Sequence, residues 1–185
     1  MEKRMLFLMA DGFEEMEFTA PYDILMRAGV KVTLASIHED AMVESARGLQ
    51  IRTDALFPEI RRADYDGIFL PGGARGVQNL RASEDVLDCV REFYENKKWV
   101  TAICAGPTVL AAAGILQNHK VTSYPANEAD LAPYCKAYLQ DRVVVDGKVV
   151  TSRGPGTAEE FALTLVTLLL GQSKATEIRK GIVAR

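Results

Sequence analysis

Short apolar runs alternate with amphipathic segments along most of the chain. Continuous apolar runs bounded by turn residues are typical of buried strands, whereas apolar residues spaced three and four apart predict helices. The alternation of the two patterns indicates a mostly parallel sheet with helices on both faces. The predicted strands lie at 5–10, 30–35, 65–70, 100–103 and 120–123, with a hairpin at 143–150 and a further short strand or hairpin arm at 47–53 beside the second strand.

The helices are bounded by residues that commonly start or stop them. Gly29 ends the first helix, Ser83 caps another, and Pro107 is suited to a first helical turn. Pro21 lies too deep for a first turn and predicts a kink or a late helix start. The predicted helices lie at 14–28, from 83, from 107, at 161–170 and at 174–183, and 151–157 is expected to be a loop.

The segment from Val100 to Thr108 carries the first candidate for chemistry. An apolar strand turns through small residues into a helix that starts at Pro107, so Cys104 lies on a sharp strand-to-helix elbow. Such an elbow exposes the sulfur, places it near a helix N-terminus that favours a thiolate, and leaves backbone N–H groups free for an oxyanion. The alternative is a buried structural cysteine, which is common among free cysteines.

Two further features are expected at the same edge of the sheet. Glu17 shares an apolar helix stripe, which is unusual for a carboxylate, and Glu14 competes with it as the functional acid. Gly72 and Gly73 follow a strand and indicate either a close backbone approach or a plain connection. The carboxyl ends of parallel strands meet at one edge, so these groups are expected to converge on Cys104.

Composition limits the class of protein. The 185 residues predict one domain, 1–185, and a net charge of −3 gives no reason to expect nucleic acid or an anionic membrane as partner. We find no signal-peptide pattern or membrane-length apolar run, and three cysteines without metal-like spacing favour a reducing, cytoplasmic compartment. Cys89 lies on a core stripe and is interpreted as packing. No metal or phosphate-binding pattern is visible, so no cofactor is expected.

Four segments in order resemble one family: Gly12 to Glu17, Leu70 to Gly73, Ala102 to Pro107, and Thr151 to Thr157. The chain resembles the ThiJ/PfpI superfamily, in the branch of the parkinsonism-associated protein deglycase. The resemblance implies a flavodoxin-like three-layer sandwich and a homodimer. It maps the nucleophile onto Cys104, the acid onto Glu17 and the oxyanion donors onto the backbone N–H groups of Gly73 and Ala105. It also implies that Arg47 reaches the neighbouring subunit's pocket.

The acid and the sulfur cannot both carry charge easily. Adjacent like charges oppose joint ionisation, so the workable arrangement is a protonated Glu17 that donates a hydrogen bond to a Cys104 thiolate. The chain departs from the family at two places: Tyr124 stands where relatives often have histidine, and Ala105 stands where the protease-like branch has one. Tyr124 either orients a substrate carbonyl or supplies a proton, or it is a packing residue.

Three functions compete. The first is a glyoxalase or deglycase that attacks methylglyoxal, glyoxal or early glycation adducts on protein through a hemithioacetal on Cys104. The second is a redox-responsive sensor or chaperone in which Cys104 becomes a sulfinate. The third, a cysteine protease, lacks its base, because His119 is expected at the opposite sheet edge and only His38 remains.

Overall fold

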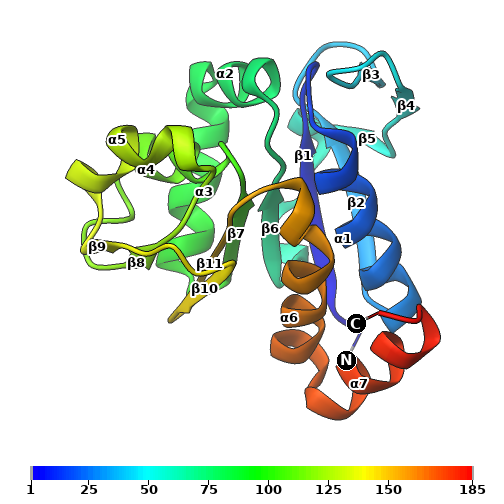
Figure 1. The fold of residues 1–185 in the computed structure, drawn as a ribbon. Coiled ribbons are helices and arrows are strands. Elements are labelled where there is room, and N and C mark those ends of the chain that lie inside the picture. The colour runs from blue at the N-terminus through cyan, green and yellow to red at the C-terminus, as the bar shows by residue number, and fades with distance from the viewer. Residues whose placement is uncertain (1, 185) are drawn as a thin grey trace.

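The computed structural model describes residues 2–184, and within them seven strands form one central sheet (Figure 1). The strand order is β10-β11-β7-β6-β1-β2-β5, and all neighbours are parallel except β10 and β11. The predicted parallel sheet and the predicted hairpin are therefore confirmed. The strands are β1 (Arg4–Met9), β2 (Lys31–Ser36), β5 (Ala55–Leu56), β6 (Gly67–Leu70), β7 (Trp99–Ile103), β10 (Val143–Asp146) and β11 (Val149–Ser152).

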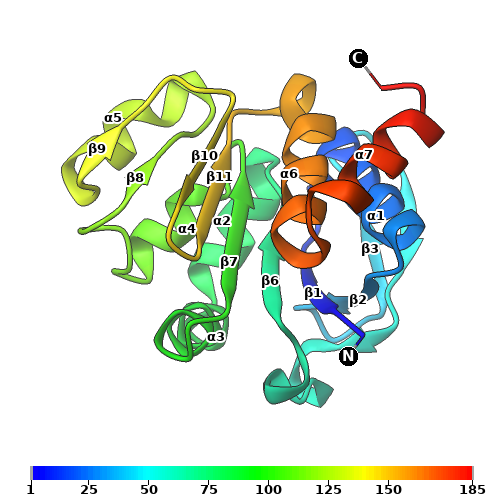
Figure 2. The same ribbon diagram turned by 90° about the horizontal axis from the view of Figure 1, so that it is seen from below.

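Helices cover both faces of the sheet, which gives the three layers of the expected sandwich (Figures 1 and 2). One face packs on α1 (Glu15–Ala28), α6 (Ala158–Leu170) and α7 (Gln172–Gly181). The other packs on α2 (Ala74–Ala82), α3 (Glu84–Glu95), α4 (Pro107–Ala112) and the short α5 (Glu128–Leu131). Along β1, Met5 and Phe7 enter the first core and Leu6 and Leu8 the second, as the period of two in a strand requires.

The three central strands bring the candidate residues together. β6 lies between β1 and β7, and all three are parallel, so their carboxyl ends meet at one edge. The chain leaves β1 into α1, leaves β6 through Gly72 and Gly73, and leaves β7 at Cys104. The expected convergence is therefore confirmed by the strand order alone.

Two predicted strands lie outside the central sheet, and the prediction of a hairpin arm at 47–53 is confirmed. The segment at 120–123 contributes only β8 (Lys120–Val121), which pairs with β9 (Ala137–Tyr138) outside the central sheet. The segment at 47–53 contributes β4 (Gln50–Arg52), which pairs with β3 (Met42–Glu44) and not with β2. Each pair therefore forms a separate two-stranded sheet.

The helix boundaries differ from the prediction in several places. α2 was not predicted, because it carries Gly76 in its interior and buries few apolar side chains, chiefly Val77 and Leu80. α1 begins at Glu15 and runs through Pro21, so a late start is wrong. Residues 151–152 belong to β11, and α6 and α7 begin three and two residues earlier than expected.

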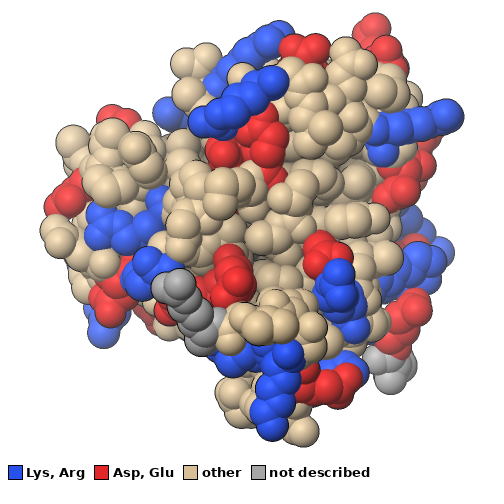
Figure 3. Space-filling view, turned by 45° about the vertical axis from the view of Figure 1, so that its right-hand side comes forward, with Lys and Arg blue, Asp and Glu red and all other residues tan. Residues whose placement is uncertain are grey.

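On the face drawn in Figure 3, positive and negative side chains lie in small mixed groups, and uncharged surface lies between the groups. Between residues 2 and 184, no helix has both the length and the apolar character needed to cross a membrane.

Candidate active site

Cys104 occupies the sharp elbow predicted between β7 and α4. Its φ of 63° lies in the left-handed region, which residues other than glycine rarely adopt. Two backbone hydrogen bonds of 2.9 Å hold it there: its N–H donates to Ser152 O, and its carbonyl accepts from Tyr124 N–H. The surrounding structure thus enforces a strained conformation at a reactive residue, which is where such strain is typically found.

The cysteines differ in their access to solvent. Cys104 is half-buried and lines a pocket, whereas Cys89 is fully buried. Burial raises the pKa of Cys89 to about 12, so its thiol stays protonated and inert. The interpretation of Cys89 as a packing residue is confirmed, and the structural reading of Cys104 is not favoured.

Glu17 is the acid that lies against the sulfur. Its side chain is fully buried at the start of α1, and it lies beside Cys104 against Gly72. Glu14, the competing candidate, instead caps the helix, and its Oε2 accepts from Glu17 N–H at 2.9 Å. The two acids therefore have different roles: Glu14 stabilises the helix start and Glu17 faces the thiol.

The two carboxylate oxygens of Glu17 have different environments. Oε2 accepts a hydrogen bond of 2.9 Å from Gly72 N–H. Oε1 is buried without a nitrogen or oxygen partner among the described residues. A buried carboxylate oxygen without a donor is costly, so Oε1 is the natural position for a proton.

Burial favours the protonated acid. It raises the pKa of Glu17 from 4.5 to about 7, and the charge of Glu14 raises it further, while hydrogen bonds from Cys104 and Gly72 oppose the shift. Glu17 therefore keeps a proton at pH values where an exposed glutamate has lost it. This agrees with the protonated Glu17 expected from the sequence, whereas the raised pKa of Cys104 opposes the thiolate expected beside it.

The pKa of the Cys104 thiol is raised, whereas the position near a helix N-terminus was expected to lower it. Burial raises the pKa of Cys104, and the charged form of Glu17 raises it further. The backbone N–H groups of Ala105 and Gly73 point at the sulfur and lower this pKa. The raised pKa favours the neutral thiol, and the pair titrates as one coupled unit.

Other atoms lie so close to Gly72 and Gly73 that neither position has room for a side chain. A Cβ on Gly72 would lie 2.2 Å from Glu17 Oε2 and 2.6 Å from the Cβ of Cys104. Gly73 has a φ of +95°, and a Cβ there would lie 2.1 Å from Gly12 O. The plain-connection interpretation of the two glycines is therefore wrong.

A pocket of about 540 Å³ opens over the sulfur. Of the residues singled out in the sequence, Gly72 lies beside Glu17 and the others line the pocket: Glu14, Glu17, Arg47, Gly73, Cys104, Ala105 and Tyr124. Sequence reasoning missed the opposite wall, because it is built from α2 and α5, of which neither was predicted. That wall includes Gln78, Arg81, Asn127 and Asp130.

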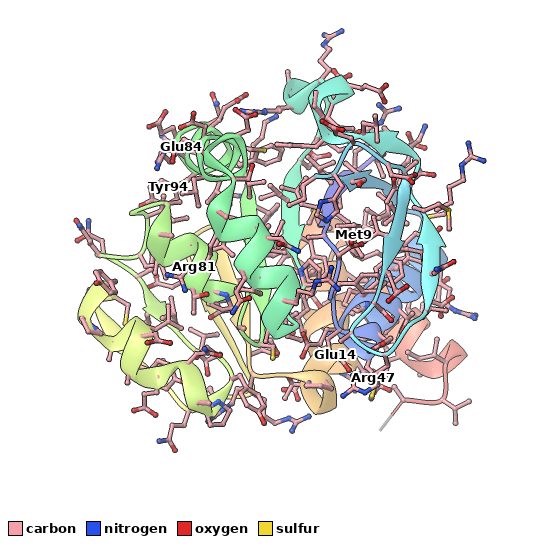
Figure 4. The ribbon with its side chains drawn as sticks, turned by 90° about the horizontal axis from the view of Figure 1, so that it is seen from above. Met9, Glu14, Arg47, Arg81, Glu84 and Tyr94 are labelled. Atoms are coloured by element: carbon pink, nitrogen blue, oxygen red, sulfur yellow. The ribbon has the colours of Figure 1, made fainter. Side chains whose placement is uncertain are left out.

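Arg47 lies at the pocket mouth beside Glu14 (Figure 4). Its guanidinium binds Glu14 at 3.3 Å and Glu15 at 2.9 Å. Burial opposes the charge on Glu15, but hydrogen bonds from Ser45 and Arg47 outweigh it and lower the pKa of Glu15 to about 2. The contact of Arg47 with a neighbouring subunit stays a prediction.

Tyr124 stands with its ring against Gly154 and is half-exposed in the pocket. Neither histidine lines this pocket: His38 accepts from Asp11 N–H at 2.9 Å, and His119 contacts Tyr94 OH at 2.9 Å. The expected position of His119 away from the site is confirmed. A cysteine–histidine pair is therefore absent from the site.

Comparison with known proteins gives consistent matches over the chain. The model of the DJ-1/PfpI family matches residues 3–168. The chain is 40% identical to protein dj-1beta of Drosophila melanogaster, covering 99% of this chain and 98% of that protein. The crystal structure of Drosophila melanogaster DJ-1beta has a TM-score of 0.96 and covers 100% of both chains.

Two further relatives have informative names. The glutathione-independent glyoxalase DJ-1 of Schizosaccharomyces pombe is 34% identical over 98% of each chain. A structure described as oxidized DJ-1 of Toxoplasma gondii is 33% identical, with a TM-score of 0.93 and 98% coverage of both chains.

We predict that Gly72→Ala destabilises the protein by about 1–3 kcal/mol, because the added methyl overpacks the space between Glu17 and Cys104. Urea unfolding measures the free energy. Gly156→Ala is the matched control, since a Cβ there meets nothing within 4 Å. Equal stability of the two variants would contradict the close packing.

We also predict a pH-dependent difference in stability between wild type and Glu17→Gln. The folded protein keeps the Glu17 proton between pH 4.5 and about 7, whereas the unfolded chain releases it. The free energy of unfolding of wild type therefore falls as the pH rises. Relative to wild type, the free energy of unfolding of Glu17→Gln rises by about 3 kcal/mol between pH 4.5 and 8. Urea unfolding across this range measures it.

Glu15→Gln is the control for that experiment. The pKa of Glu15 is lowered, so its contribution is lost only as the pH falls below 4.5. Its difference from wild type should stay flat between pH 4.5 and 8. An equally flat profile for Glu17→Gln would show that Glu17 is ionised throughout.

Proposed function

The chain belongs to the DJ-1/PfpI family, and on that premise we propose that it is a cysteine-dependent, glutathione-independent glyoxalase acting on 2-oxoaldehydes such as methylglyoxal. The observation that carries this proposal is the buried Oε1 of Glu17, which has no donor among the described residues and belongs to an acid facing the Cys104 thiol. An acid that holds a proton near neutral pH beside a nucleophile is suited to move protons during a reaction. The name of the fission-yeast relative supports the same activity.

The reaction begins with the shared proton on Glu17. The Cys104 thiolate attacks the aldehyde carbon, and the carbonyl electrons move to oxygen. The backbone N–H groups of Gly73 and Ala105, which lower the pKa of Cys104, are proposed to stabilise this oxyanion. Glu17 then gives its proton to the oxygen, which yields a hemithioacetal and leaves Glu17 as a carboxylate.

The second half moves a hydrogen between adjacent carbons. The Glu17 carboxylate removes the proton from the former aldehyde carbon and returns a proton to the neighbouring carbonyl carbon. The hydroxyl proton of the hemithioacetal passes to the oxygen of that neighbouring carbon, which produces a thioester of the 2-hydroxy acid. Water then cleaves the carbon–sulfur bond and releases the hydroxy acid and the Cys104 thiol. The sum is methylglyoxal plus water giving lactate plus one proton, with no external oxidant or reductant.

The same first step applies to early glycation adducts of proteins, so deglycation is a branch of this proposal. Tyr124 is proposed to orient the substrate carbonyl, because its half-exposed ring lies in the pocket beside Gly154, on the side of Glu17 Oε1. The lack of a histidine in the pocket gives no support to a cysteine protease.

We predict that wild type converts methylglyoxal to lactate without glutathione and that Cys104→Ala abolishes lactate formation. Glu17→Gln keeps the fold but lowers kcat by about 100-fold or more, because the amide cannot move a proton. Lactate is identified directly, since loss of aldehyde alone also follows from adduct formation. Cys135→Ala, outside the pocket, serves as the control. Lactate formed by Cys104→Ala would refute the mechanism.

A redox role is the second candidate, and the half-exposure of Cys104 beside a proton-donating acid favours it. We predict that mild hydrogen peroxide adds two oxygen atoms to Cys104, as a sulfinate, before Cys135 reacts. Cys89 should remain unmodified because it is buried. Peptide mass spectrometry measures each site, and equal oxidation of Cys104 and Cys135 would argue against a sensor.

A further inference from the structure

A second, smaller hollow adjoins the active-site pocket. It has a volume of about 260 Å³ and shares three wall residues with the pocket: Arg81 at the end of α2, Thr108 in α4 and Asp130 in α5. Ala111, Ala112 and Tyr134 complete its lining. The second hollow therefore lies directly beside the active-site pocket, on the other side of these three side chains.

The two arginines that line the pocket differ in whether they form ion pairs. On one side, Arg47 is bound to Glu14 and Glu15. On the opposite side, where Figure 4 places Arg81, neither Arg81 nor Asp130 forms an ion pair or side-chain hydrogen bond with any residue from 2 to 184. Arg81 is thus the guanidinium of the pocket that remains available to a ligand.

We propose that the second hollow binds the far end of 2-oxoaldehydes longer than methylglyoxal, and that Arg81 binds a carboxylate at that end. The inference rests on the proposed function, because it places the aldehyde carbon at Cys104. A guanidinium presents a planar set of donors that matches a carboxylate with two parallel hydrogen bonds. Thr108 does not compete for Arg81, since its hydroxyl donates to Ala105 O at 2.8 Å.

Asp130 by itself would favour a cationic end. A primary amine condenses with an aldehyde, however, so a 2-oxoaldehyde with a free amino group does not persist, whereas one with a carboxylate does. The negative charge of Asp130 therefore weakens the attraction of the hollow for an anion. The two residues are expected to have opposite effects on an anionic substrate.

The matched probes are 4,5-dioxopentanoate and its methyl ester. In both, the aldehyde carbon bonds to the Cys104 sulfur, the hydrogen moves to the neighbouring carbon and water releases the hydroxy acid, which is 2-hydroxyglutarate from the first probe. The far group takes no part in the chemistry. The ratio of their kcat/KM values therefore isolates recognition of the carboxylate.

In wild type, we expect this ratio to favour 4,5-dioxopentanoate by about tenfold, as one exposed charge-assisted pair contributes. Arg81→Gln should bring the ratio to one or below, because Asp130 remains, and Asp130→Asn should raise it above the wild-type value. Arg61→Gln removes an exposed arginine outside both hollows and should leave the ratio unchanged. If Arg81 and Asp130 only maintained the shape of the pocket, their substitution would lower turnover of both probes equally and leave the ratio unchanged.

A binding measurement separates this inference from the proposed function. Calorimetry on Cys104→Ala protein compares 2-hydroxyglutarate with 2-hydroxypentanoate, which lacks the second carboxylate. Tighter binding of 2-hydroxyglutarate that disappears with Arg81→Gln supports the subsite even if no lactate forms from methylglyoxal. Lactate formation with equal affinities, or with a substrate ratio that Arg81→Gln leaves unchanged, overturns the subsite and leaves the glyoxalase intact.

Discussion

A buried carboxyl group and a thiol lie in contact at this site, and the pair cannot carry two negative charges. Burial penalises each charge, and each charge penalises the other. One proton must therefore remain on the Glu17–Cys104 pair near neutral pH. Backbone N–H groups modulate this balance, because two of them favour charge on sulfur and one favours charge on Glu17.

The backbone around the pair follows from this constraint. The donors must approach the sulfur and the acid more closely than any side chain at Gly72 allows, and Gly73 must adopt a positive φ to continue into α2. Cys104 must also leave β7 in a left-handed conformation for its sulfur to face α1. Hydrogen bonds to Ser152 and Tyr124 stabilise that conformation from both sides, so the strain is distributed over the end of β11 and the segment after β8.

The sequence predicted those parts of the fold that depend on local patterns. Continuous apolar runs gave β1, β6 and β7, and the parallel arrangement then placed Glu17, Gly73 and Cys104 at one edge. α2 was missed because its exposed polar surface and Gly76 hide a short apolar face. The direction of the Cys104 pKa shift was also missed, because burial is a property of the whole packing and cannot be read from the position of one elbow.

The pocket has an inner part formed mainly by backbone groups and an outer wall formed by side chains. The reacting centre uses mainly backbone donors, which are supplied by the turn geometry of residues 72–73 and 104–105 and are independent of most side chains. The outer wall uses side chains on α2 and α5, which neither hold the elbow nor touch the shared proton. The charge at Arg81 and Asp130 can therefore change without disturbing the Glu17–Cys104 pair. Under the proposals made above, chemistry and choice of substrate would depend on physically separate parts of one pocket.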